Sequence, residues 1–436
     1  MELKGSCRPA TRLGPCLGLG LEPTGRHDTA QGPDLISNLP NGVLRHIISL
    51  LPTKDGARTQ SLSTQWGHLF RSAPLNLEVE LRREDEPAPS SLVSRILADH
   101  QAPCRRLSLT WYGYKSDYVT PFLNGWLQSP ALNDLRELDL WQNRKESGRE
   151  RWVVPREDPH TLPPSVLRFS PTLRILSINS TGVVISEGYL HSILAGCPVI
   201  DSLVLSELDG VRGVRINSST LRRLGVSSGF VHGPEEVLQQ VIIEDAPLLE
   251  KLFLSGLDSD LSISLVCAPK LDFLGSLPEG FTKVKLETTV LQRIVAVSLK
   301  SVVSTVKVLV LRMSPASVDD AIDYATLFPC LEKLYVLLYR VGASKRARHH
   351  FPLDHTECFE LHLKKIVLMN YQGTPRDLYF ARFFLLNAKV LEHMLDKRAS
   401  EGAQFDFVVD SYFGDDIHIG HIHDLTAADP FDSSLC

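Results

Sequence analysis

The sequence has 436 residues, of which 43% are hydrophobic and 22% are charged. This balance supplies enough apolar side chains for large packed cores and too few charges for wholesale disorder, so we expect a globular protein. The formal net charge of -5 gives no general attraction to nucleic acid or to anionic lipid, and neither is expected as a partner. No stretch approaches about 18 uninterrupted apolar residues, the length that a membrane-spanning helix needs.

The eight cysteines are scattered, with no CxxC pair and no regular zinc spacing, so we expect reduced thiols and no metal site. No cofactor-binding pattern is present either, and none is expected. Residues 1–25 contain no apolar run long enough for a secretion signal. We therefore expect a cytoplasmic or nuclear protein.

Residues 1–33 are rich in Gly, Pro and Arg and show little periodicity, which predicts a disordered tail. After this tail, apolar residues recur at helical spacing and predict a short helix that Pro52 ends. The apolar positions of this helix are Val43, Leu44, Ile47, Ile48 and Leu51.

A second helix is expected after Pro52, with Asp55 as its N-terminal cap. Arg58, Leu62 and Trp66 follow at steps of four residues, and Leu69 comes about one turn later. About 40 residues are too few to bury the apolar faces of both helices. Periodicity alone leaves two occupants open for the exposed face, namely the chain's own following domain and another protein.

Residues 34–76 resemble the F-box of plant F-box proteins with leucine-rich repeats. The matching residues are ISNLP at 36–40, VLRHIISLLPTKD at 43–55, and then Arg58, Leu62, Ser63 and Trp66. The resemblance implies docking onto a Skp-type adaptor and, through it, onto a cullin scaffold. The residues that it assigns to adaptor binding or to the support of that face are Leu39, Pro40, Val43, Leu44, Ile47, Ile48 and Leu51. The residues that it assigns to the core of the helical bundle are Arg58, Leu62, Trp66 and Leu69.

The sequence departs from the usual F-box pattern at three places, which are Asn41-Gly42, Gly56 and Gln65. Asn41-Gly42 replaces the usual acidic pair, and Gln65 stands where a basic residue is common. Gly56 lies early in the second expected helix, where glycine costs about 1 kcal/mol relative to alanine.

A short apolar pattern recurs downstream, as in LRELDL at 135–140, LRILSI at 173–178, LRRLGV at 221–226 and LEKLYV at 331–336. A core that repeats every 21 to 38 residues or so is typical of a leucine-rich solenoid. The predicted fold is therefore α/β: a small N-terminal helical F-box, then an irregular leucine-rich-repeat solenoid over residues 77–354, with a parallel sheet on its concave face. Between repeats, Ser186 is expected to cap a helix that Gly196 ends.

The residues between the inward apolar positions of each strand should point outward, onto the surface where a target could bind. These candidate contact residues are Glu137, Asp139, Arg174, Ser177, Asp201, Val204, Arg222, Lys251 and Phe253.

Residues 355–412 resemble the FBD module that ends many plant F-box proteins, and GTPRDLYFARFFLLNAKVLEHM is its most specific part. Phe380, Phe383 and Phe384 recur there at helical steps, so the module should seat a long helix on the last strands and complete the solenoid. Residues 413–436 are expected to be a polar C-terminal tail.

Three further patterns have a functional and a simpler interpretation. Gly225–Gly229 reads GVSSG and fits the GxSxG pattern of a hydrolase, but Val226 already serves as an apolar strand position. His418, His421 and His423 could ligate a metal, although a polar tail is favoured. The basic run SKRARHH at 344–350 is either a solvated loop or a weak nuclear localisation signal.

The resemblance implies a non-catalytic substrate-recognition subunit of a Skp-cullin-F-box ubiquitin ligase, which holds an adaptor through the F-box and an unknown target protein through the repeats. The alternative is a leucine-rich-repeat interaction scaffold whose F-box is degenerate and takes no part in ubiquitin transfer.

Overall fold

A computed structural model covers the chain. The structure describes residues 36, 38–82, 88–112, 116–143, 160–161, 163–179, 183–206, 211–227, 238–255, 262–278, 283–286, 289–291, 305–339, 362–387 and 404–408. The expected tails at 1–33 and 413–436, the histidines at 418–423 and the basic run at 344–350 lie outside these residues.

Three short helices form the N-terminal unit: α1 (Asn41–Leu50), α2 (Thr53–Arg58) and α3 (Thr64–Ser72). A single 3-10 turn, Thr59–Ser61, joins α2 to α3. The second helix begins three residues earlier than the sequence predicts. Pro52 occupies its N-cap position, and Asp55 lies in its first turn instead of capping it.

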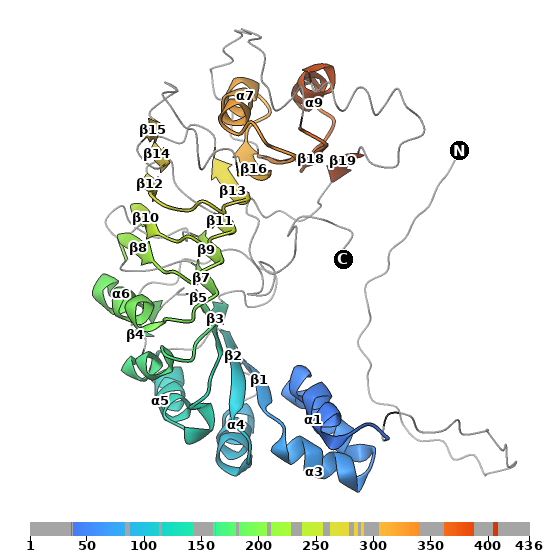
Figure 1. The fold of residues 1–436 in the computed structure, drawn as a ribbon, viewed down its shortest axis with the longest axis vertical. Coiled ribbons are helices and arrows are strands. Elements are labelled where there is room, and N and C mark those ends of the chain that lie inside the picture. The colour runs from blue at the N-terminus through green and yellow to red at the C-terminus, as the bar shows by residue number, and fades with distance from the viewer. Residues whose placement is uncertain are drawn as a thin grey trace, which may run out of the picture.

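Twelve of the described strands form one sheet, and every neighbouring pair in it is parallel. Figure 1 shows these strands stacked along an arc from β1 to β19. The strands are β1 (Leu75–Arg82), β2 (Cys104–Tyr112), β3 (Glu137–Asn143), β5 (Ile175–Asn179), β7 (Ser202–Ser206), β9 (Arg223–Ser227), β11 (Lys251–Ser255), β13 (Phe273–Pro278), β16 (Val308–Met313), β17 (Lys333–Leu338), β18 (Lys365–Met369) and β19 (Gln404–Val408). The predicted α/β solenoid with a parallel sheet is confirmed.

A row of backbone hydrogen bonds joins the turns that precede the strands. From β5 to β18, the residue just before each strand donates its N–H to the carbonyl of the equivalent residue one repeat earlier, as in Arg174 to Arg136 (2.8 Å) and Arg222 to Asp201 (2.9 Å). The next residue usually donates to the same carbonyl, as Ile175 does to Arg136 (3.0 Å). The register of one repeat on the next is therefore fixed before the strand begins.

The outer side of the arc is built from mixed elements (Figure 1). Its helical parts are α4 (Ala88–Asp99), α5 (Ser116–Leu127), α6 (Glu187–Gly196), α7 (Val318–Leu327), α9 (Pro375–Asn387) and the 3-10 segments Pro130–Leu132 and Pro164–Phe169. Its strands are β4 (His160–Thr161), which pairs with β6 (Val183–Val184), and the set β8 (Gly213–Asn217), β10 (Gln240–Asp245), β12 (Ser262–Leu265), β14 (Lys283–Leu286) and β15 (Thr289–Leu291).

The five-stranded outer sheet takes the place of helices in the middle repeats. In β8, Val214 and Ile216 are buried, whereas Arg215 and Asn217 are exposed. This alternation with a period of two is typical of a strand that is covered on one face only. The main hydrophobic core lies between the large sheet and this outer wall, and it runs from Leu75 to Phe384.

Helix α9 begins with a compact capping motif. Gly373 adopts a left-handed backbone conformation (φ 72°), Thr374 precedes α9, and Pro375 is the first helical residue. The buried Asp377 carboxylate accepts hydrogen bonds from the N–H groups of Gln372 and Thr374, both at 3.1 Å, and the Asp377 N–H donates to Thr374 Oγ1. This reciprocal capping aims α9 so that Phe380, Phe383 and Phe384 enter the core.

Helix α6 begins as the sequence predicts, because Ser186 Oγ accepts the N–H of Tyr189 (3.2 Å). Gly196 is the last residue of this helix, but its backbone is not left-handed. A Cβ at Gly196 would lie 2.9 Å from the Cβ of Ser170. The glycine is therefore required by close packing between α6 and the turn that holds Ser170.

Replacing Gly196 with alanine should destabilise the protein by about 1–3 kcal/mol, because the new methyl group overpacks against Ser170. Gly188 lies in the same helix with open space around its Cβ position. Gly188→Ala should therefore stabilise by about 0.5–1 kcal/mol through helix propensity. Urea unfolding of both variants would measure these changes. Equal effects would contradict the packing argument.

Candidate functional site

Helix α1 carries two apolar faces, and one of them is exposed. Val43, Ile47 and Leu50 are 45%, 37% and 67% exposed and lie on one stripe at steps of three or four residues. Ile36 and Leu39, which precede the helix, are also exposed. We call these five residues, Ile36, Leu39, Val43, Ile47 and Leu50, the outer stripe.

The other apolar face of α1 packs inside the helical bundle. Leu44 is fully buried and Ile48 is 3% exposed, and both pack with residues of α3 and the turn after it. The cluster is completed by Trp66, Leu69, Ala73 and the partly buried Phe70. Leu44 and Ile48 are therefore placed to support the outer stripe from behind, which is one of the two roles that the resemblance gives them, and they do not present side chains to a partner.

The remaining predicted residues divide between surface and core. Pro40 is exposed and Leu51 is half-buried, so both border the outer stripe. Leu62 is 65% exposed, and the exposed Arg58 guanidinium pairs with Asp55 at 2.8 Å. Neither Leu62 nor Arg58 belongs to the bundle core, because the 3-10 turn between α2 and α3 breaks the step of four residues on which that expectation rested.

The positions that depart from the usual F-box pattern make specific contacts. The Gln65 side-chain amide donates to Asn41 Oδ1 at 2.8 Å, so two of the departures form one bridge between the starts of α1 and α3. Gly56 is buried, and a Cβ there would lie 3.3 Å from the Phe70 ring and 3.6 Å from Ile48 Cγ2. The missing side chain lets α2 approach α3 closely.

The helical unit is tied to the first strand of the solenoid. The Asn76 side chain in β1 donates to the carbonyl of Ser49 near the end of α1 (2.8 Å) and to the carbonyl of Leu51 just after it (3.1 Å). Thr53 Oγ1 donates to the Asn76 carbonyl (2.6 Å), and His100 Nε2 lies 2.9 Å from the Ala73 carbonyl. The orientation of the outer stripe relative to the large sheet is set by these contacts.

The inner face of the large sheet is the second candidate surface. Its middle row is polar at one end, where Ser108 Oγ donates to Asp139 Oδ2 at 3.0 Å, and apolar from β7 to β18. We call the apolar cluster on this face the inner stripe; it consists of Val204, Phe253, Val310, Tyr335 and Val367 of the middle row and Phe273 of the adjacent row, where it pairs with Lys251. These residues form a cluster that is separate from the main core.

The candidate contact residues on this face are less exposed than the sequence suggests. Glu137, Arg174, Asp201 and Arg222 are exposed or half-buried at the starts of the strands. The others are buried, which corrects the expectation that they form an open surface. The buried residues are Asp139, Ser177, Val204, Lys251 and Phe253.

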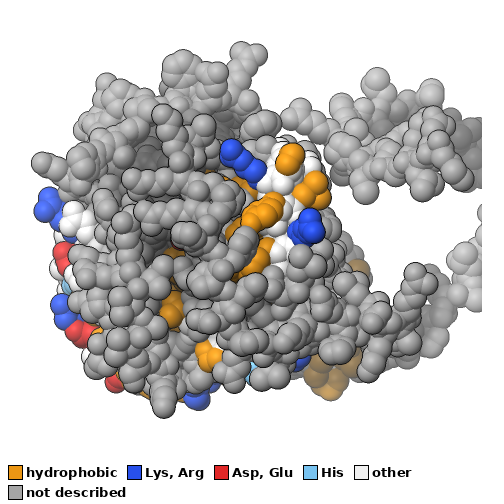
Figure 2. Space-filling view, turned by 90° about the horizontal axis from the view of Figure 1, so that it is seen from above, with side chains coloured by type: hydrophobic (Ala, Val, Ile, Leu, Met, Phe, Trp, Pro, Cys, Tyr) orange, Lys and Arg blue, Asp and Glu red, His pale blue; other side chains and the backbone are white. Residues whose placement is uncertain are grey.

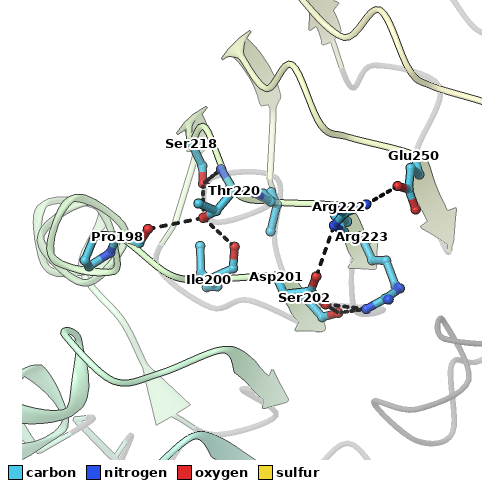
Figure 3. A network of polar contacts seen from close by, with 10 residues as sticks. Pro198, Ile200, Asp201, Ser202, Ser218, Thr220, Arg222, Arg223 and Glu250 are labelled. Carbon is cyan, nitrogen blue, oxygen red and sulfur yellow. Dashed lines mark hydrogen bonds and ion pairs between the residues drawn. The ribbon is translucent and has the colours of Figure 1, made fainter.

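Charged residues of both signs follow the turns at the starts of the strands. Arg222 lies between Asp201 and Glu250 and pairs with both, with Nε 3.6 Å from Asp201 Oδ1 (Figure 3). Arg223 also pairs with Asp201 and donates to Ser202 Oγ at 2.8 Å. We call this row the charge ladder; its residues are Arg136, Arg174, Asp201, Arg222, Glu250, Asp272, Lys307, Glu332 and Lys364.

Glu332 is the best-paired carboxylate at the far end of the charge ladder. Lys364 Nζ lies 2.8 Å from Glu332 Oε2, and Lys307 Nζ lies 3.2 Å from Oε1. The hydrogen bond from Lys364 is the main reason why the pKa of Glu332 lies below its usual value. The ionised carboxylate therefore bridges the repeats on both sides.

The structure favours the simpler interpretation of the hydrolase pattern. Ser227 is the last residue of β9 and pairs with Ser206 and Ser255 of the neighbouring strands, so it lies within the sheet as a repeat position. Within the described residues, no three side chains form a metal-binding group and no helix is long and apolar enough to span a membrane. Cys104 is a free thiol, and burial raises its pKa to about 12.

A third exposed apolar feature lies on α9. Leu378 and Tyr379 are exposed on this helix, and Arg376 and Arg382 are exposed beside them. Figure 2 looks down on the end of the solenoid that carries α7 and α9, and it shows apolar side chains gathered between Lys and Arg side chains there.

Comparison with known families agrees with these features. The F-box domain family matches residues 36–78, the FBD family matches residues 352–395, and the repeats described as "FBD-associated F-box protein At5g56370, LRR repeats" match residues 171–336. The fold and the exposed helix define a leucine-rich-repeat solenoid preceded by an F-box. The chain therefore combines matches to an F-box domain, to FBD-associated leucine-rich repeats and to an FBD domain, and it is similar to plant F-box proteins that carry such parts.

Curated relatives from Arabidopsis thaliana are named as F-box/LRR-repeat proteins or as FBD-associated F-box proteins. The chain is 30% identical to F-box/LRR-repeat protein At4g14096 over 220 residues, which is 45% of each protein. It is 28% identical to F-box/LRR-repeat protein At5g35995 over 277 residues (58% of this chain, 57% of the relative). FBD-associated F-box protein At5g22730 is 26% identical over 259 residues (56% and 51%). The matches span about half the length of these relatives.

The two faces of α1 should respond differently to truncation. Leu44→Ala should destabilise the protein by about 2–5 kcal/mol, because it empties a fully buried site in the bundle. Val43→Ala, one residue earlier on the outer stripe, should change the free energy of unfolding by less than about 0.5 kcal/mol. Thermal or urea unfolding would check this. A large loss for Val43→Ala would mean that the outer stripe is packed within the chain.

Removing the Glu332 charge should alter the pH dependence of stability. The pKa of Glu332 is lower in the folded than in the unfolded protein. Its ion pairs therefore stabilise the fold fully above the unfolded-state pKa of about 4.3, and this stabilisation is lost as the pH falls through the folded-state pKa. Glu332→Gln should therefore cost up to about 1 kcal/mol at pH 7 and nothing at pH 2. Urea unfolding at several pH values would measure this, with Lys364→Ala as the partner in a double-mutant cycle. An equal loss at pH 7 and pH 2 would exclude the ionic origin.

Proposed function

We propose that this chain is the substrate-recognition subunit of a Skp-cullin-F-box ubiquitin ligase. In this proposal, the outer stripe binds a Skp-type adaptor, which links the chain to a cullin scaffold, and the solenoid binds a target protein. The observation that carries the proposal is a continuous aliphatic surface on the F-box helix that stays exposed after the bundle has satisfied its own core. The proposed location is the cytoplasm or the nucleus.

The size of the outer stripe bears on the affinity. Its five side chains are roughly half exposed, so covering them would contribute about 4–8 kcal/mol if full burial is worth about 1.5–3 kcal/mol each. Association itself costs an estimated 4–15 kcal/mol. The stripe therefore supplies the centre of an interface, and tight binding needs neighbouring contacts such as Pro40 and the exposed Leu62.

Target binding is assigned to the solenoid because its charge ladder presents exposed residues of both signs along one edge of the inner face. Such a row can fix the register of a partner through charge complementarity. The chain would supply no reacting group. Its contribution to ubiquitin transfer would be proximity, since a target bound on the arc has a raised effective concentration near the charged conjugating enzyme.

The second candidate function is a repeat scaffold with a degenerate F-box. The unusual residues of the F-box kept this alternative open. In the structure, Asn41 bonds to Gln65 and Gly56 fits closely against Phe70, so these residues are compatible with an intact bundle. This observation favours adaptor binding over the scaffold.

The outer stripe can be tested without disturbing the fold. Val43→Asp with Ile47→Asp should reduce co-purification with a plant Skp-type adaptor by at least about tenfold, because two charges would enter an apolar interface at a cost of several kcal/mol. Arg45→Asp is a matched control, because Arg45 is exposed on the same helix but points away from the stripe. Circular dichroism and thermal unfolding should show that all of these proteins stay folded.

Two results would count against the proposal. Equal adaptor binding by the wild type and the double variant would exclude the outer stripe as the docking surface. If the folded wild type does not bind the adaptor, the repeat scaffold becomes the favoured function. Substitution of Leu44 would be a poor test, because this side chain is fully buried in the bundle and its loss would unfold the F-box.

A further inference from the structure

The inner stripe is buried although its described members come from a single layer. Val310 and Tyr335 are fully buried, and Val204 is 1% exposed. Every described residue of this cluster belongs to a strand of the large sheet, including its partly buried neighbours Ile175, Val308 and Met369. One face of a sheet cannot remove its own apolar side chains from water, so the stripe is a surface for an apolar occupant.

Cationic residues run beside the inner stripe on the same face of the sheet. Lys333 and Tyr335 are two residues apart in β17, as are Lys251 and Phe253 in β11, so each cation projects on the same side as its apolar neighbour. Lys365 begins β18 in the same row, where it is the strand neighbour of Lys333. Arg223 begins β9 beside Lys251 in this row, but its guanidinium is already paired with Asp201. The occupant that fits carries large apolar side chains and negative charge.

Residues 409–436 of this chain have that chemistry. They contain no Lys or Arg, and their acidic residues are Asp410, Asp415, Asp416, Asp424, Asp429 and Asp432. Their large apolar residues are Tyr412, Phe413, Ile417, Ile419, Ile422, Leu425, Phe431 and Leu435. The segment at 340–361, in contrast, contains the basic run SKRARHH, and 1–35 has equal numbers of acidic and basic residues.

The position and length of this segment also fit. It follows Val408, the last residue of β19, which pairs with Met369 at the end of β18. The inner stripe runs from β18 back to β7, which is six strand steps or about 29 Å at about 4.8 Å per step. An extended segment of 28 residues reaches up to about 90 Å, so it can cross the whole stripe with length to spare.

We propose that residues 409–436 dock along the inner stripe, with their apolar side chains on Phe253, Val310 and Tyr335 and their aspartates beside the flanking cations. This inference goes beyond adaptor binding and does not depend on it. It makes the chain's own acidic segment the resident ligand of the face that a target would approach. A target that uses the inner stripe must displace this segment or bind a surface that the segment completes.

Hydrogen–deuterium exchange on the full chain tests the docking. The wild type should protect amides within residues 409–436, and the variant Lys333→Glu with Lys365→Glu should exchange them at least about tenfold faster, because the flanking charge is reversed. The matched control is Lys270→Glu with Arg382→Glu, which reverses two exposed cations away from the stripe and should leave the protection unchanged. Protection of β1 to β3 reports whether each variant stays folded.

A second variant keeps the solenoid intact. Asp415→Asn with Asp416→Asn alters only the proposed ligand and should also increase exchange in residues 409–436. The proposal is overturned if the wild type exchanges these amides as fast as an unfolded peptide, if they stay protected in both charge variants, or if the control variant releases them equally. None of these readouts involves the adaptor, so failure of the docking leaves the proposed function standing, and the reverse holds as well.

Discussion

The structure depends on the backbone hydrogen bonds that stack one repeat on the next. A single repeat has a short strand and one turn or helix, and it cannot bury its apolar residues alone. The turn residues donate to the repeat before them along the whole row from Arg136 to Lys364, and the strands continue the same register. The main core, the buried inner stripe and the charge ladder are three consequences of that one register, because each consists of equivalent positions brought into line.

The F-box is built on a different principle. Its helices are too short to hold a large core, so Leu44, Ile48, Trp66 and Leu69 form a small cluster, and the remaining aliphatic residues stay in water. An exposed apolar surface carries a cost in solubility, which a chain with a proposed adaptor partner can bear. The tie from Asn76 to the carbonyls of Ser49 and Leu51 then makes this surface part of the same rigid framework as the sheet.

Much of the fold could be predicted from the sequence, and the misses have physical causes. Repeats with the full apolar pattern were recognisable, but β1, β2, β16 and β19 lack the leading leucine or its spacing and were visible only as alternation, as in LNLEVEL at 75–81. The outer sheet was missed because its strands, such as the β-branched VIIED at 241–245, lie outside the recurring apolar pattern. In α1, Leu44 and Ile48 could not be separated from Val43 and Ile47, since periodicity does not tell which of two adjacent aliphatic stripes meets α3. Leu50 was missed although it follows Val43 and Ile47 at regular helical steps.

Because hydrogen bonds fix the F-box to β1, the number of repeats sets how far each strand lies from the outer stripe. Each strand adds about 4.8 Å to the arc, and the first strand is fixed to the helix that carries the outer stripe. The distance from the outer stripe to any point on the inner face is therefore set by how many repeats lie between them. Inserting or deleting one repeat would shift every later position on the inner face by one strand spacing, so evolution can change the reach of the solenoid without changing any residue of either surface.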